Sequence, residues 1–154
     1  MARTFRLTAD GGSRGNPGPA GYGAVVSENG KIIAELYDVI GTATNNVAEY
    51  LALKAGLEGA LEINPAARIL VRMDSKLVIE QMSGTWKIKH PDMIQLAAEV
   101  QKIARGHEVK FMWIPREENS RADALANKAM DESADSTISA EGEVLRAQIG
   151  RAHV

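Results

Sequence analysis

The chain has 154 residues, which is the length of one domain with a single hydrophobic core. Hydrophobic residues make up 45% and charged residues 25%, as in ordinary globular proteins, and the net charge of −2 does not indicate a strongly basic nucleic-acid binder. The absence of cysteine excludes disulfides and thiolate metal sites. The sequence shows neither a signal peptide nor a membrane-spanning apolar run, so we expect a cytoplasmic monomer without a membrane partner.

The first part of the chain predicts three strands. Residues 3–10 alternate between apolar and polar side chains, which is typical of a strand, and Asp10 faces away from the apolar side. The stretch that follows is dense in Gly and Pro and is interpreted as a loop. Residues 21–27 and 32–40 then form two strands joined by a hairpin turn at Asn29-Gly30, where positive φ is tolerated. An antiparallel meander is therefore expected.

The periodicity becomes helical near residue 46. Apolar residues at helical spacing predict a helix over 46–63, which Asn64-Pro65 ends. The remaining predicted elements are a strand over 68–73, a helix from Asp74-Ser75 to Ser83-Gly84, a helix over 91–104, a strand over 109–114 with Trp113 in the core, and a helix over 120–130. The order βββαβααβα predicts an α/β fold in which the later strands are parallel.

The end of the chain differs in composition from the rest. Residues 133–154 are polar, acidic and rich in small side chains, apart from a segment over 141–149 that could form a short helix. Such a composition cannot bury enough apolar surface to form part of a core. We therefore expect one domain over residues 1–132, followed by a flexible tail or linker over 133–154.

Four acidic residues stand at the ends of the predicted elements, and each has an ordinary structural alternative. Asp10 could open an Asx turn into the Gly-rich loop, and Asp74 could start the helix that follows it. Glu49 lies three residues after Asn46, so it fits a capping box at a helix start, and Asp123 fits the same pattern after Ser120. Taken singly, none of the four acids identifies a catalytic site.

Taken together, the four acids point to a metal site. If the first and fourth strands are neighbours, Asp10 and Asp74 meet at the crevice where α/β sheets place ligands, and Glu49 and Asp123 approach from two helices. Carboxylates at short range cannot all stay ionised without cations. Mg²⁺ prefers hard oxygen ligands, and two such ions can activate a water and stabilise the leaving oxygen in phosphodiester hydrolysis. The four acids are therefore the candidate metal ligands and catalytic residues.

Four segments of the sequence resemble the type 1 ribonuclease H family in their order and spacing: DGGSRGNPGPAGYG, TNNVAEYLAL, MDSKLVIEQM and WIPREENSRADALA. Each segment carries one of the four acids. The resemblance implies a ribonuclease H-like α/β fold, with a mixed five-stranded sheet of three antiparallel and two parallel strands flanked by helices. It also implies an endonuclease that hydrolyses the RNA strand of RNA–DNA hybrids with two Mg²⁺ ions, for which Mn²⁺ is expected to substitute, leaving 5′-phosphate and 3′-hydroxyl ends.

The resemblance also implies which residues contact the hybrid. A minor groove that displays 2′-hydroxyls lets a protein distinguish RNA from DNA, and other contacts go to phosphates or to the DNA strand. A tryptophan after the second helix would pack on the DNA strand, although a core position is the ordinary alternative, and the basic residues could be plain surface charge. The candidate substrate-binding residues are Gly11, Ser13, Asn16, Thr44, Asn45, Asn46, Lys76, Trp86, Lys87, Lys89 and Arg116.

The sequence departs from the family pattern in two places. Many members carry a long basic insertion after the second helix, where this chain has the short segment GTWKIKHPDM. Many also have a histidine in the loop before the last acid, where this chain has PREENSRAD, with Arg116 as the nearest replacement. These features are similar to a compact branch of archaeal enzymes and of actinobacterial fusion proteins. In the fusion proteins a phosphatase-like domain follows, so a fused C-terminal domain in the native gene is an open alternative.

Two other functions remain open at this point. One is a different nuclease of the same broad superfamily that cuts DNA, and the other is a silent module that binds hybrids without cleaving them. Cleavage of an all-DNA duplex would indicate the first, and binding without cleavage would indicate the second. The presence of all four acids favours an active enzyme.

Overall fold

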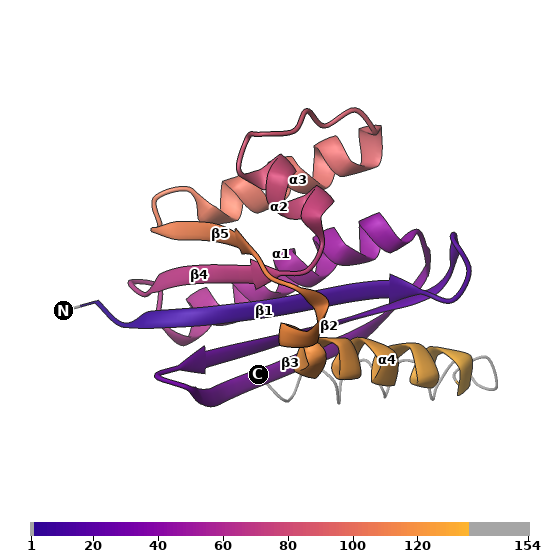
Figure 1. Cartoon of the computed structure of the whole chain (residues 1–154), viewed down its shortest axis with the longest axis horizontal. Coiled ribbons are helices and arrows are strands. Elements are labelled where there is room, and N and C mark those ends of the chain that lie inside the picture. Colours follow the sequence, from indigo (N-terminus) through magenta and orange to yellow (C-terminus); the bar gives the residue numbers. More distant parts are fainter. Residues whose placement is uncertain (1, 136–154) are drawn as a thin grey trace.

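A computed structural model of the protein describes residues 2–135 and contains one mixed five-stranded sheet in the order β3-β2-β1-β4-β5 (Figure 1). Its strands are β1 (Thr4–Ser13), β2 (Gly18–Glu28), β3 (Lys31–Ala43), β4 (Arg68–Met73) and β5 (Val109–Trp113). The helices are α1 (Asn45–Ile63), α2 (Lys76–Met82), α3 (Pro91–Ala104) and α4 (Ser120–Asp135), with a 3-10 turn η1 (Arg116–Glu118). The predicted order of elements and the mixed sheet are confirmed.

The pairing of β1 positions two of the acids. β1 is antiparallel to β2 and parallel to β4, and β4 is parallel to β5. In the register between β1 and β4, Thr8 is opposite Arg72. Asp10, which lies inside β1, and Asp74, which directly follows β4, each come two residues later, so they lie at the same level of the sheet. The first and fourth strands are thus neighbours, which is the condition under which the sequence brings Asp10 and Asp74 together.

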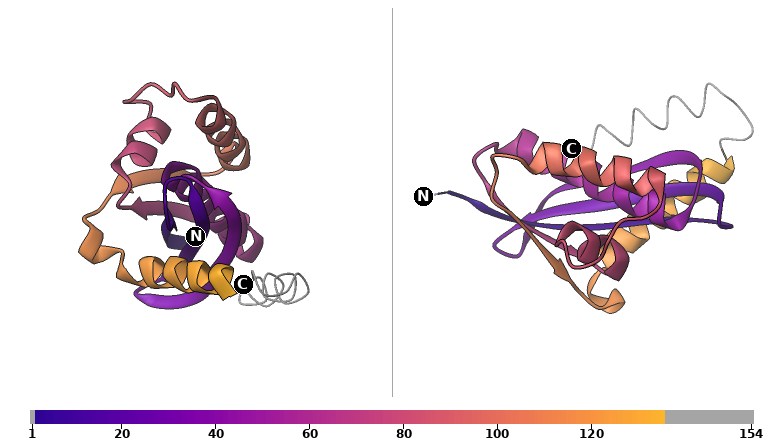
Figure 2. Two further views of the ribbon diagram at one scale, coloured as in Figure 1. Left: turned by 90° about the vertical axis from the view of Figure 1, so that its right-hand side faces the viewer. Right: turned by 90° about the horizontal axis from the view of Figure 1, so that it is seen from above.

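Helices cover both faces of the sheet. α1 lies behind the sheet in Figure 1, and α4 lies in front of β2 and β3. α2 and α3 lie at the β5 end of the molecule, at the opposite end from α4 (Figure 2). The core between the sheet and α1 includes Phe5, Leu7, Leu53, Leu57 and Val71, all fully buried. No described helix has the length and apolar character needed to cross a lipid bilayer.

The predicted loop after residue 10 is wrong, because most of it is strand. β1 continues to Ser13 and β2 begins at Gly18, so only residues 14–17 connect them. Gly15, with a φ of +98°, serves the short turn itself, whereas Gly11 and Gly23 permit close packing of helices. A Cβ at Gly11 would lie 2.2 Å from the Ala48 carbonyl oxygen of α1, and one at Gly23 would lie 2.5 Å from the Leu125 side chain of α4. The sheet therefore uses glycine where helices approach its backbone.

Other boundaries also differ from the predictions. β3 is longer than predicted at both ends, and α4 continues to Asp135. The prediction that Trp113 belongs to the core is wrong, because its side chain is 46% exposed. β5 is an edge strand, and its residues are only partly covered. The segment over 141–149, which could form a short helix, and most of the predicted tail lie outside the described residues.

Candidate active site

A polar pocket of about 430 Å³ opens where β1, β4, α1 and α4 meet. It collects all four candidate acids, although they are far apart in the sequence. The residues that line it are Asp10, Gly11, Gly12, Ser13, Arg14, Asn45, Glu49, Asp74, Arg116, Asp123, Ala126, Asn127 and Met130. The four acids therefore lie together in one pocket, as the sequence pattern predicts.

Asp10 and Glu49 form the buried side of the pocket. Asp10 lies within β1 on the face opposite Phe5 and Leu7, and it is only 9% exposed. Glu49 lies one turn into α1, and its Oε1 accepts a hydrogen bond of 2.6 Å from the Gly11 backbone N–H. The close approach of α1 to β1 at Gly11 is what brings Glu49 next to Asp10.

Asp74 and Asp123 are supplied by the end of β4 and by α4. Asp74 directly follows β4, and its Oδ1 accepts a hydrogen bond of 2.7 Å from the Asn119 side chain. The Trp113 indole donates to the Asp74 carbonyl oxygen at 3.2 Å. Asp123 lies in the first turn of α4. Two strands and two helices thus contribute one carboxylate each.

The structural alternatives for these acids do not hold. Asp10 lies within a strand rather than a turn. The N-cap of α1 is Thr44, whose hydroxyl accepts from Val47, so Glu49 is not paired with a cap at Asn46. Ser75 caps α2 through its hydroxyl, which leaves Asp74 free of that role. Ser120 is already the first residue of α4 and not the cap that precedes it, so Ser120 and Asp123 do not form a capping box.

Crowding of the acids changes their proton affinity. Burial is the main cause that raises the pKa of Asp10, to about 10, and the nearby carboxylates of Glu49 and Asp74 raise it further. Burial also raises the pKa of Glu49, to about 7, against the opposing effect of hydrogen bonds with Asp10 and Gly11. Within residues 2–135, no basic side chain forms a salt bridge with any of the four acids. The acids of the pocket therefore have no basic partner in a salt bridge, and without a cation it is the retained proton of Asp10 that relieves part of their repulsion.

The donor set fits hard divalent cations. Carboxylate oxygens are the ligands that Mg²⁺ prefers, and a cation in the pocket would relieve the repulsion that raises the pKa of Asp10. In the part of the chain that the structure describes, no group of three or more Asp, Glu or His side chains is positioned so that it could hold a metal ion. Glu49 and Asp74 instead direct oxygens to protein donors, Gly11 and Asn119.

The candidate substrate-binding residues fall into three groups. Gly11, Ser13, Asn45 and Arg116 line the acidic pocket. A second pocket of about 140 Å³ contains the other polar candidates from the β1–β2 connection and the start of α1, and its lining residues are Asn16, Thr44, Asn46, Val47, His90 and Met93. The remaining candidates lie in neither of these two pockets, and they are Lys76, Trp86, Lys87 and Lys89.

Hydrogen bonds join the first two groups. The Asn45 Oδ1 accepts from the Ser13 backbone N–H at 2.9 Å and from the Ser13 hydroxyl at 3.1 Å. The Asn45 backbone N–H in turn donates to Asn16 Oδ1 at 3.0 Å. The β1–β2 connection and the start of α1 therefore form one continuous polar rim beside the acids.

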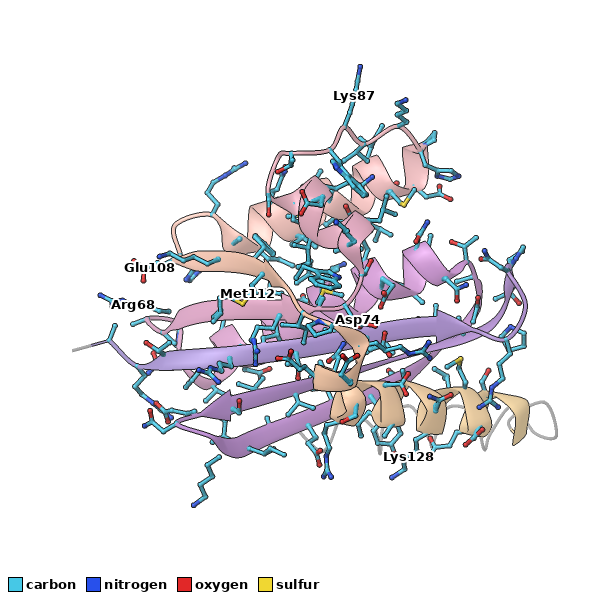
Figure 3. All side chains as sticks on the ribbon, viewed as in Figure 1. Arg68, Asp74, Lys87, Glu108, Met112 and Lys128 are labelled. Atoms are coloured by element: carbon cyan, nitrogen blue, oxygen red, sulfur yellow. The ribbon has the colours of Figure 1, made fainter. Side chains whose placement is uncertain are left out.

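The loop between α2 and α3 carries the third group, except for Lys76, which begins α2. Trp86 is 43% exposed, so the alternative of a core tryptophan is wrong at this position. Lys87 points away from the body of the molecule, far from Asp74 in the view of Figure 3. Lys76 is exposed at the start of α2. These residues do not contact the acidic pocket.

The sequence analysis missed Asn119 and Arg14. Asn119 is buried between the acids, and Arg14 lines the pocket while it forms a salt bridge with Asp131. Both positions are polar residues in loops, and nothing in their local pattern distinguishes them. Only the three-dimensional fold shows that they belong to the site.

Comparison with known proteins identifies the family. Residues 8–129 match the family described as reverse transcriptase-like. The solved N-terminal RNase H domain of Rv2228c from Mycobacterium tuberculosis superposes with a TM-score of 0.84 at 51% identity, covering 88% of this chain and 99% of that one. The chain belongs to the type 1 ribonuclease H family. Its mixed sheet and its helices are those of the ribonuclease H fold.

Other members of the ribonuclease H family extend the comparison. The bifunctional protein Rv2228c of M. tuberculosis is 53% identical over 133 residues, which are 84% of this chain but 36% of that protein. Ribonuclease HI of Halobacterium salinarum is 46% identical over 126 residues, covering 80% of this chain and 63% of that enzyme. LC11-RNase H1, solved in complex with an RNA/DNA hybrid, gives a TM-score of 0.82 at 39% identity, covering 85% and 99% of the two chains.

Proposed function

We propose that this protein is an endoribonuclease that hydrolyses the RNA strand of RNA–DNA hybrids. The observation that carries the proposal is the convergence of Asp10, Glu49, Asp74 and Asp123, from four separate elements, on one polar pocket. Membership of the type 1 ribonuclease H family supports it, as does the hybrid bound to the related LC11-RNase H1. A pocket lined by acids is unsuited to binding a polyanion alone, so cations must take part.

Divalent cations are the proposed cofactor, with two Mg²⁺ ions held by the four acids and Mn²⁺ as a substitute. Held by these acids, the ions would supply the activation of a water and the stabilisation of the leaving oxygen for a hydrolysis that leaves 5′-phosphate and 3′-hydroxyl ends. Burial of Asp10 in the rigid sheet and the approach of Glu49 from α1 fix the carboxylates before substrate arrives. Arg116, which also lines the pocket, is placed to neutralise a phosphate beside them.

The polar rim beside the acids is the proposed contact with the hybrid. Ser13, Asn16 and Asn45 are linked by hydrogen bonds and offer groups that suit the 2′-hydroxyls of a minor groove. Gly11 and Asn46 flank this rim. Thr44 is proposed to hold a DNA phosphate, although its hydroxyl also caps α1.

The loop between α2 and α3 is the proposed second contact. Trp86 is exposed and offers a face on which the DNA strand can stack. The neighbouring cations suit phosphates further along the duplex, and they are Lys76, Lys87 and Lys89. The loop is short, so we expect weaker hybrid binding than in members with a long basic insertion.

The domain organisation is also a proposal. Residues 1–132 are proposed to form a monomeric catalytic domain and residues 133–154 a polar tail or linker. The relative Rv2228c is named a bifunctional protein, and this chain matches only part of it. We also propose that the native gene fuses a phosphatase-like domain to this one. The sequence of that gene tests this proposal directly.

The test is cleavage of three end-labelled duplexes of one sequence: an RNA–DNA hybrid, an RNA–RNA duplex and a DNA–DNA duplex. Wild type is compared with Asp74→Asn and with the exposed control Asp92→Asn. We expect cleavage of the hybrid alone in Mg²⁺ or Mn²⁺, lost in Asp74→Asn and retained in the control. Cleavage of the all-DNA duplex, or binding without cleavage in both metals, would contradict the proposal. Full activity of Asp74→Asn would exclude Asp74 as a metal ligand.

A further inference from the structure

The buried amide of Asn119 lies between the elements that carry three of the acids. Asn119 follows η1 and precedes α4, and it is only 2% exposed. A fully buried polar side chain loses its bonds to water, so it is retained only where protein groups replace them. Its partners therefore indicate what it does.

The Asn119 side chain joins β1 to the end of β4. Its Nδ2 donates to the Ala9 carbonyl oxygen at 2.9 Å and to the Asp74 Oδ1 at 2.7 Å. Ala9 is the residue immediately before Asp10. Both protons of one amide group are thus used, one on the strand that carries Asp10 and one on the carboxylate of Asp74.

The Asn119 backbone extends the connection to a third acid. Its carbonyl oxygen accepts a hydrogen bond of 3.0 Å from the backbone N–H of Asp123. One residue therefore contacts Asp74 directly, the backbone beside Asp10, and the backbone of Asp123. A displacement of Asn119 would change the positions of all three acids relative to one another.

The unpaired atom of this side chain favours a role in the site over a role in the fold. The Oδ1 of Asn119 is buried and has no hydrogen-bond partner among the described residues. A buried acceptor without a partner costs free energy, so an apolar side chain of similar volume would serve packing better. An asparagine at this position is explained by its two donors.

We infer that Asn119 is a positioning residue that holds the Asp74 carboxylate in register with Asp10 and Asp123. The inference rests on the proposed function, because it assigns Asn119 to the geometry of the same acids. Partners of metal-binding side chains fix the orientation of those side chains, and their loss costs metal affinity or activity. Asn119 acts through Asp74 and the backbone, and it is not itself a ligand in this inference.

Two variants of Asn119 separate positioning from packing. Asn119→Ala removes the amide and leaves a void, whereas Asn119→Leu removes the amide but keeps a side chain of the same branching that fills the space. The control is Asn64→Ala, because Asn64 lies at the distant end of α1 and its Oδ1 accepts from the Ala66 N–H. For each protein we would measure kcat and KM on the hybrid, Mn²⁺ affinity by calorimetry without substrate, and stability in urea.

We expect both Asn119 variants to lose about 10- to 100-fold in kcat or in Mn²⁺ affinity. KM for the hybrid should stay within about threefold, because the polar rim is untouched. Asn119→Leu should restore stability relative to Asn119→Ala without restoring activity. Asn64→Ala should lose stability and keep the wild-type kcat and Mn²⁺ affinity.

Wild-type kcat and Mn²⁺ affinity in Asn119→Leu would overturn the inference, since packing alone would then suffice. The same conclusion would follow if both variants were unfolded at 25 °C, because Asn119 would then serve the fold. If the wild type did not cut hybrids, the proposed function would fail by itself. The Mn²⁺ titration would still decide whether Asn119 positions the acids.

Discussion

Replacing Asp10 with asparagine is expected to stabilise the metal-free protein, by an amount that grows with pH. Burial, and then the neighbouring acids, raises the pKa of Asp10 in the folded protein to about 10 from its ordinary value of 3.8. The folded state therefore keeps a proton that the unfolded chain releases above about pH 4. Stability from this group is complete below pH 3.8 and is lost as pH rises toward 10.

The size of the effect follows from the same shift. One pKa unit corresponds to about 1.4 kcal/mol, so the roughly three units between the unfolded pKa and pH 7 give an upper limit of about 4 kcal/mol. Asp10 is only 9% exposed, so solvent screening reduces this little. Asparagine cannot ionise in either state. Asp10→Asn should therefore gain up to about 4 kcal/mol at pH 7, and under about 1 kcal/mol at pH 4.

Urea unfolding between pH 4 and pH 7, in a chelator that removes divalent cations, measures this difference. The control is Asp92→Asn, since the Asp92 side chain is 70% exposed in the first turn of α3. Loss of that charge should cost about 0.3–1 kcal/mol through the helix dipole. A stability difference for Asp10→Asn that is constant over this pH range, or a loss of stability, would refute the electrostatic account of the pocket.

Two further substitutions test the packing around the site. Gly11→Ala would place a Cβ 2.2 Å from the Ala48 carbonyl oxygen, so we expect a loss of more than about 2 kcal/mol in urea unfolding, as β1 and α1 are forced apart. Trp113→Ala should cost clearly less than the about 3–5 kcal/mol typical of a core tryptophan, because this side chain is half exposed on an edge strand. A core-sized loss in the same unfolding assay would contradict that position for Trp113.

Most of the fold could be predicted because local patterns in the chain agree with its tertiary structure. The strand over 68–73 is confirmed to the residue, since its apolar run is short and clearly bounded. The prediction of a loop after Asp10 is wrong because glycines in this segment are needed for contact with helices that are distant in the sequence. Gly11 and Gly23 make room for α1 and α4, and no local pattern shows that a helix will pack there.

The candidate site likewise contains residues that the sequence predicts and residues that only the fold reveals. The four acids could be predicted because each follows a recognisable motif, and strand adjacency brings Asp10 and Asp74 to the same level. Asn119 could not be predicted, because its partners Ala9 and Asp74 are remote in sequence. Trp113 was assigned to the core because an aromatic residue in a strand usually packs inward, whereas its strand lies at the sheet edge.

Because α4 packs on β2 and β3, the candidate site can be completed only late in the synthesis of the chain. Domains fold as units as the chain emerges from the ribosome, N-terminal part first. Asp10, Glu49 and Asp74 emerge early, yet Asn119 and Asp123 reach them only when α4 covers Gly21 and Gly23. Under the proposed function, a nascent chain that already carries three acids is inert toward RNA–DNA hybrids until its last described helix is in place.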